Sequence, residues 1–277
     1  MTRLPMIMVP AFTAAFFLFI GAASAEIEVL WLGHATTRIT SNTGKVIVID
    51  PFLTKNPKTP ARYRDLKALG KVDLILVTHG HQDHVLDLLA LVLLTGAKVV
   101  GTYEYVNNLV ALGVLKGENV ISMNKGGYVE PLGRGIRVHM VPAEHSSSVD
   151  NFSLGLWDSK SNQSRHTEGG VAVGYVVELE NGFKIYHSGD TAVFGDMALI
   201  GTLLQPDLAL VCIGGKFTMG PEGAAYAMRE LIKPKQVIPI HYGTYPAINS
   251  TPAEFKKALD GTSVEVLDLF PGQALTF

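Results

Sequence analysis

Thr78-His79-Gly80-His81-Gln82-Asp83-His84 is the stretch of the chain that decides its fold. Three imidazoles and one carboxylate lie within six consecutive residues, and both kinds of side chain bind divalent metal ions. Residues 72–78 read as a buried strand that leads into the cluster, and residues 85–95 read as a helix that follows it. Proteins of the α/β class place their sites at the carboxyl ends of strands. The pattern therefore favours a catalytic metal site over a surface turn that is merely rich in histidine.

The spacing within this cluster suggests two metal ions. His79 and His81 are two residues apart and can point to the same side of an extended turn, which Gly80 keeps uncrowded. Asp83 and His84 come later along the turn and can face a second ion. This mixture of ligands suits zinc first, with manganese or iron as alternatives, and the carboxylate favours a catalytic over a sealed structural site.

One turn cannot supply all the ligands of two ions, so further ligands are expected at other strand ends. Three candidates share that placement, because each follows an apolar run and lies beside a turn. They are His145 after residues 138–141, Asp190 after residues 184–188, and His241 after residues 237–240.

Strand and helix patterns alternate along the chain, which predicts an α/β protein with two mixed β-sheets face to face and helices outside. We expect one domain over residues 26–277. The expected strands are residues 27–32, 37–39, 45–49, 72–78, 98–100, 136–141, 171–179, 184–188, 208–213 and 237–240, and the expected helices are residues 85–95, 104–112, 197–204, 222–231 and 252–259.

Composition sets the class of partner. Of the 277 residues, 47% are hydrophobic and 17% are charged, which allows a large core and disfavours intrinsic disorder. The formal net charge is -2, and no Lys/Arg run is present, so a small-molecule substrate is expected and a nucleic-acid partner is not. The one cysteine, Cys212, lies in an apolar run and is expected to be buried. The oligomeric state stays open.

Residues 1–25 have the order of a secretory signal peptide. Arg3 is followed by an apolar stretch and then by the small-residue site Ala23-Ser24-Ala25. The alternative is a retained membrane anchor, but the stretch is shorter than the ~20 residues that a spanning helix needs, and Pro10 interrupts it. We expect an exported, periplasmic protein with no stable membrane insertion after cleavage.

Residues 150–170 are rich in Ser, Asn, Asp and Gly and have no clear period. A loop of this length in a compact domain is usually functional or disordered. Because it follows a candidate ligand, a lid over the site and a plain surface loop are both open.

The ligand pattern resembles that of the metallo-β-lactamase superfamily: His-x-His-x-Asp-His, a histidine after a strand, a Gly-Asp and a late Ile-His-Tyr-Gly. The match runs from Ile27 to the C-terminus. Three flanking motifs resemble those of metal-dependent hydrolases related to ascorbate-6-phosphate lactonases and, more distantly, to N-acyl-phosphatidylethanolamine phospholipases. They are Trp31-Leu32-Gly33-His34-Ala35-Thr36, Phe217-Thr218-Met219-Gly220-Pro221 and Pro239-Ile240-His241-Tyr242-Gly243-Thr244.

This resemblance implies a four-layer αββα sandwich with two divalent ions at one edge of the sheets. It also implies a bracing role for Asp50, which would hold the metal loop by hydrogen bonding. The implied ligands are His79, His81 and His145 for the first ion, Asp83, His84 and His241 for the second, and Asp190 as a bridge. The signal peptide is unusual for this group, and the role of Lys216, just before the Phe217 motif, stays open.

The implied reaction is hydrolysis of an ester, lactone, amide or phosphodiester bond by a metal-bound hydroxide, which Asp83 and Asp190 would orient. Tyr242 or His34 would steady the developing oxyanion. We expect His34 to face the site without binding metal, the alternative being a structural role in its turn. His139 and His187, which lie inside strands, are expected to be packed and hydrogen-bonded. The competing reading is an exported metal-binding or redox protein without hydrolytic activity.

Overall fold

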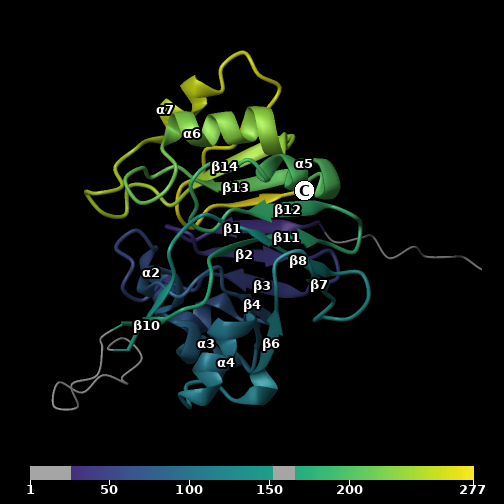
Figure 1. Cartoon of the computed structure of the whole chain (residues 1–277), viewed down its shortest axis with the longest axis vertical. Helices are drawn as coiled ribbons and strands as arrows, with labels where there is room; N and C mark the ends of the chain where they lie inside the picture. The colour runs from purple at the N-terminus through teal and green to yellow at the C-terminus, as the bar shows by residue number, and fades with distance from the viewer. Residues whose placement is uncertain (1–25, 152–165) are drawn as a thin grey trace, which may run out of the picture.

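Figure 1 shows the computed structural model of the chain, which describes residues 26–151 and 166–277. The expected signal peptide and the middle of the 150–170 segment lie outside these residues. Two mixed seven-stranded sheets face each other, and helices cover both outer faces (Figure 1). The predicted αββα fold is therefore confirmed. No helix in the described ranges combines the length and the apolar character that a membrane crossing requires.

The first sheet has the order β16-β1-β2-β3-β4-β5-β6. It is antiparallel from β16 to β3 and parallel from β3 to β6. In that order its strands are Ala274–Thr276, Glu28–Trp31, Thr37–Thr40, Val46–Ile49, Leu74–Leu76, Lys98–Thr102 and Val120–Met123.

The second sheet has the order β15-β14-β13-β12-β11-β8-β7. It is parallel from β15 to β12 and antiparallel from β12 to β7. In that order its strands are Glu265–Val266, Gln236–Ile240, Leu208–Cys212, Lys184–His187, Val173–Glu178, Arg137–Pro142 and Tyr128–Val129. A separate hairpin pairs β9, Ser148–Asp150, with β10, His166–Glu168.

Each strand divides its side chains between two cores because successive residues point to opposite faces of a sheet. In β13, Leu208 and Leu210 join the core between the sheets, whereas Ala209 and Val211 join the core under the outer helices. Every side chain of this strand is buried, which explains its continuous apolar run. Burial on this scale contributes roughly 1.5–3 kcal/mol for each Val or Leu side chain.

Helices α3, Leu88–Thr95, and α4, Tyr103–Ala111, pack on the outer face of the first sheet. The second sheet is covered by α5, α6, η3 and α7, which are Met197–Leu204, Pro221–Tyr226, Ala227–Ile232 and Pro252–Ala258. Four short helices lie between these elements. They are α1, η1, α2 and η2, which are Ala61–Arg64, Leu66–Leu69, Gln82–Val85 and Gly117–Asn119.

Two expected helices differ from the structure. The helix expected at residues 85–95 is two helices, α2 and α3, because the chain bends at Asp87. The Asp87 carboxylate accepts hydrogen bonds from the backbone N–H groups of Leu53 and Thr54 at 2.6 and 2.9 Å. The helix expected at residues 222–231 begins as α6 and continues as the π-helical turn η3.

Candidate metal centre

The candidate ligands gather where strands of both sheets end. In the first sheet, β4 leads into the turn that carries His79, His81, Asp83 and His84. In the second sheet, the chain passes from β8 to His145, from β12 to Asp190 and from β14 to His241. The parallel strands of each sheet end at a shared edge, which brings residues far apart in the sequence together.

Within the described residues the side chains form three overlapping groups that could hold a metal ion. In each group, one ligand atom per residue lies within 4.8 Å of every other. The groups are His79, His81 and His145; His34, Asp83, His84 and His241; and His79, His84 and Asp190. All seven residues that the resemblance implies as ligands are among them, and His34 is the one further member.

Asp190 lies between the first two groups. Its Oδ2 atom is 3.0 Å from His241 Nε2 and 3.4 Å from His84 Nε2. The same oxygen is 3.7 Å from His145 Nε2, which belongs to the other group. This is the place that a bridging carboxylate would take.

Several ligand atoms at this centre are buried and lack a hydrogen-bond partner among the described residues. They are His84 Nε2, His241 Nδ1 and Nε2, and Asp190 Oδ1. Buried polar atoms are normally satisfied, so a cluster of unsatisfied ones needs an explanation. Imidazole nitrogens and carboxylate oxygens are the ligands that zinc and similar divalent ions take, and the residues therefore fit such ions.

Asp50 braces the metal turn from beneath, as expected. Its carboxylate accepts hydrogen bonds from Thr78 N at 2.8 Å and from Thr78 Oγ1 at 2.7 Å. The same carboxylate contacts His84 Nδ1 at 2.8 Å, which leaves His84 Nε2 directed at Asp190. Partners of this kind fix the tautomer and orientation of a metal-binding imidazole.

Burial and neighbouring charge set the protonation of the cluster. Burial lowers the pKa of His79, His81 and His145, which keeps these imidazoles neutral, as metal ligands must be. Burial would also lower the pKa of His84, but the charges of Asp190 and Asp50 outweigh it and hold that pKa well above its usual value. The space around His84 therefore favours positive charge.

The backbone at the centre is held in an unusual conformation. Three residues there have positive φ angles although they are not glycine: 55° at His34, 51° at Asp50 and 56° at His241. Such conformations cost roughly 1–3 kcal/mol each and collect at functional sites. Favourable contacts around these three residues must offset this cost.

The first hairpin strand packs on the metal turn. The backbone N–H of Gly80 donates to Ser147 Oγ at 3.1 Å. A Cβ atom at residue 80 would lie 2.8 Å from the Ser148 carbonyl oxygen, which explains why the turn has glycine here. The two described ends of the 150–170 segment thus form a hairpin beside the centre. The lid prediction itself concerns residues outside the described ranges.

Tyr245 is a site residue that the sequence patterns miss, and Thr244 enters them only as the last residue of a motif, with no role assigned to it. The ring of Tyr245 meets His34 edge to face at 5.9 Å between centroids, and Thr244 Oγ1 lies 2.9 Å from His34 Nδ1. Tyr242 instead stacks on Trp31 at 5.4 Å between ring centroids. Its expected contact with an oxyanion stays a prediction.

The other residues of interest belong to none of the three groups. His187 Nε2 is 2.9 Å from the Ala35 carbonyl oxygen in the core, as expected. His139 packs against Tyr128, as expected. Its Nε2 atom lies 3.6 Å from Glu178 and has no hydrogen-bond partner among the described residues, so the expected hydrogen bond is not found for this nitrogen. Lys216 is exposed, and its ammonium lies over the ring of Phe217.

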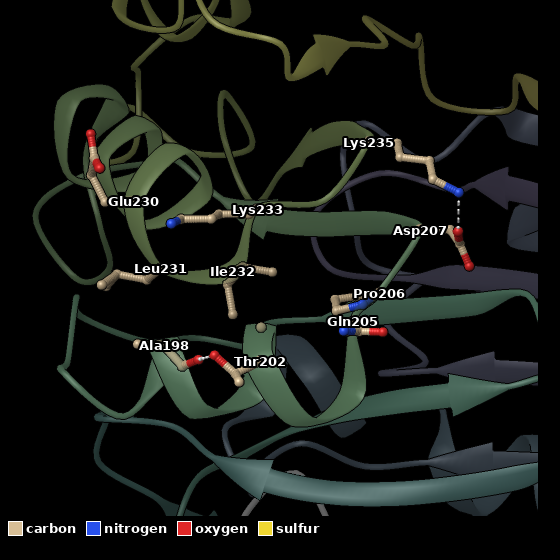
Figure 2. Close-up of a pocket in the computed structure, with 11 residues that line it drawn as sticks. Ala198, Thr202, Gln205, Pro206, Asp207, Glu230, Leu231, Ile232, Lys233 and Lys235 are labelled. Carbon is tan, nitrogen blue, oxygen red and sulfur yellow. Dashed lines mark hydrogen bonds and ion pairs between the residues drawn. The ribbon is translucent and has the colours of Figure 1, made fainter.

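A recess of about 270 Å³ opens beside the centre, with His34, Trp31 and Tyr242 in its wall. A larger hollow of about 580 Å³, shown in Figure 2, lies at the opposite ends of the strands. There Asp207 precedes β13 and pairs with Lys235, which precedes β14. The candidate ligands follow the strands rather than precede them, so this second hollow is remote from the metal centre.

Known proteins share both the sequence and the fold. A model of the beta-lactamase superfamily domain matches residues 45–242. A UPF0173 metal-dependent hydrolase of Cupriavidus necator is 50% identical over 256 residues, which cover 92% of this chain and 87% of that protein. A UPF0173 metal-dependent hydrolase of Methanosarcina mazei is 39% identical over 91% of this chain and 99% of that protein.

Among solved structures, Igni18, a metallo hydrolase of Ignicoccus hospitalis, superposes with a TM-score of 0.76 at 32% identity. The superposition covers 91% of this chain and 99% of Igni18. The resemblance to the metallo-β-lactamase superfamily is confirmed, whereas the narrower one to ascorbate-6-phosphate lactonases stays a prediction.

Proposed function

Because the chain belongs to the UPF0173 metal-dependent hydrolases and contains a beta-lactamase superfamily domain, we propose that it hydrolyses a small molecule. The bond that it cleaves is an ester, a lactone or a phosphoester. The reaction uses two divalent ions, for which zinc is the first candidate. One observation carries the proposal. Two groups of ligand atoms lie side by side, and the oxygen of Asp190 contacts members of both. Such a pair of sites is the arrangement that binuclear hydrolases need.

Divalent ions at these ligands would supply an acidified water as nucleophile and would polarise the bond under attack. The two carboxylates of the centre, Asp190 and Asp83, differ in solvent exposure and therefore have different roles in the proposed reaction. The side chain of Asp190 is 4% exposed and is surrounded by imidazoles, so it positions rather than exchanges protons. The Asp83 side chain is 35% exposed and can take a proton and pass it to the leaving group.

The recess beside His34 would hold the substrate. Its volume of about 270 Å³ suits a small molecule, and its aromatic wall excludes water from one side of the centre. Tyr245, which is 40% exposed and next to His34, could donate a hydrogen bond to a developing oxyanion.

Removing the metal tests the function directly. Dialysis against a strong chelator is expected to abolish hydrolysis of a panel of lactones, esters and phosphodiesters, and two equivalents of Zn²⁺ per chain are expected to restore it. Metal analysis and initial rates on the same samples give both readouts. A protein that binds two ions but turns over none of these substrates would support the metal-binding or redox alternative instead.

We also propose that the mature enzyme is exported. Support comes from residues 1–25, whose basic start, apolar stretch and small-residue site are typical of signal peptides. Expression of the full chain in a bacterium is expected to give a periplasmic protein whose N-terminus, by mass spectrometry, is Glu26. An uncleaved chain in the membrane fraction would indicate a retained anchor.

A further inference from the structure

His34 is fixed at the seam between the two sheets. It follows Gly33 in the turn between β1 and β2, and it is 1% exposed. Its carbonyl oxygen accepts hydrogen bonds from the backbone N–H of His241 at 2.9 Å and from Trp31 Nε1 at 3.0 Å. The ring of His34 is thereby held against the ring of His241, with 3.9 Å between their centroids.

The two nitrogens of the His34 ring have the same kinds of neighbour as those of His79. In His79, Nδ1 contacts the hydroxyl of Thr78 at 3.0 Å, and Nε2 points at another ligand, His81. In His34, Nδ1 contacts the hydroxyl of Thr244 at 2.9 Å, and Nε2 points at the carboxylate of Asp83 at 3.0 Å. An outer partner on one nitrogen, and a second nitrogen that faces other ligand atoms, are typical of metal-binding histidines.

A carboxylate oxygen and an imidazole nitrogen at 3.0 Å need a positive particle between them, either a proton or a metal ion. The remaining members of the group decide which one fits. His84 and His241 offer further nitrogens within 4.8 Å of both atoms, and more than one of these nitrogens is without a hydrogen bond in the described part of the chain. A single proton satisfies one pair of atoms, whereas a metal ion satisfies all of them at once.

We propose that His34 is itself a ligand of the ion held by Asp83, His84 and His241. The inference rests on the proposed two-ion function. It makes the two sites unequal, because this ion would have four side-chain ligands besides Asp190, whereas the other would have three. Three of those four are buried, whereas His81 and His145 are partly exposed. The ion at His79, His81 and His145 would then be the more open of the two.

The test compares three variants by Zn²⁺ content and by Zn²⁺ affinity in competition with a chelator. His34→Gln removes the imidazole but keeps an amide that can donate to Asp83. Thr244→Val removes only the outer partner, and His139→Gln replaces a histidine remote from the centre. His34→Gln is expected to lose one of two ions, with a fall in affinity larger than the roughly 10–100-fold that loss of an outer partner causes. Thr244→Val should stay within that range, and His139→Gln should match the wild type.

Cobalt gives a second readout, because the visible spectrum of bound Co²⁺ reports its coordination. The spectrum should change in His34→Gln and persist in Thr244→Val. Two ions bound by His34→Gln with wild-type affinity and spectrum would show that His34 only orients Asp83, which overturns the inference but leaves the hydrolase proposal intact. Melting of the metal-free proteins checks folding. Should His34→Gln not fold, His34→Asn replaces it, because asparagine tolerates the positive φ at this position.

Discussion

Replacement of Asp190 with alanine is expected to abolish hydrolysis and to weaken the binding of both ions together. Asp190 Oδ2 contacts His241 and His84 on one side and His145 on the other, so its loss would remove a ligand from each of the two proposed sites. Loss of an outer partner alone costs roughly 10–100-fold in activity or metal affinity, and loss of a shared ligand should exceed that. Initial rates and metal content per chain provide the measurement.

Two further variants sharpen this result. Asp190→Asn keeps the shape and one oxygen ligand, and it should retain more metal than alanine while still losing most activity. Asp196→Ala removes an exposed aspartate at the start of α5 and should behave as wild type. Two ions bound as tightly by Asp190→Ala as by the wild type would exclude the bridging position.

Among these substitutions, replacement of Asp50 with alanine is expected to lower the free energy of unfolding the most. The side chain is fully buried, and its removal leaves Thr78 N, Thr78 Oγ1 and His84 Nδ1 without their partner. Breaking a buried charged network in this way costs about 3–5 kcal/mol. For a chain of this size the melting temperature should fall by roughly 6–20 °C.

The measurement is calorimetry of the metal-free protein, so that metal loss does not contribute to the change. Asp50→Asn, which keeps one acceptor oxygen, should fall between alanine and the wild type. Asp196→Ala is the matched surface control, because this exposed aspartate makes no side-chain hydrogen bond at the start of its helix. An unchanged melting temperature in Asp50→Ala would mean that the turn is held by other contacts.

The layers of the fold could be predicted because each strand repeats the same two-faced pattern. The runs at residues 46–49 and 208–213 are apolar throughout, which is typical of strands buried on both faces. The positions of His145, Asp190 and His241 followed from a single rule, the convergence of strand ends. At these strands and strand ends the local sequence pattern agrees with the overall fold, so the sequence alone predicts the positions of the residues.

Other features depend on contacts that no local pattern reveals. Asp87 reads as one more helical residue until Leu53 and Thr54 are brought against it. His34, which contacts Asp83, also contacts Thr244, 210 positions further along the chain. The strained φ angles at His34, Asp50 and His241 arise from the same long-range packing. Intrinsic propensity disfavours such conformations, so only the assembled centre explains them.

The pairing of β16 with β1 has a consequence for how the chain comes to be folded during synthesis. Thr276 and Leu275, near the end of the chain, pair with Glu28 and Val29, near the start of its described part. A ribosome releases β1 well before β16, so the outer edge of β1 stays uncovered while the strands between them are made. An uncovered strand edge invites pairing with other chains. The latest of the described strands to be translated is thus the one that protects β1 from self-association.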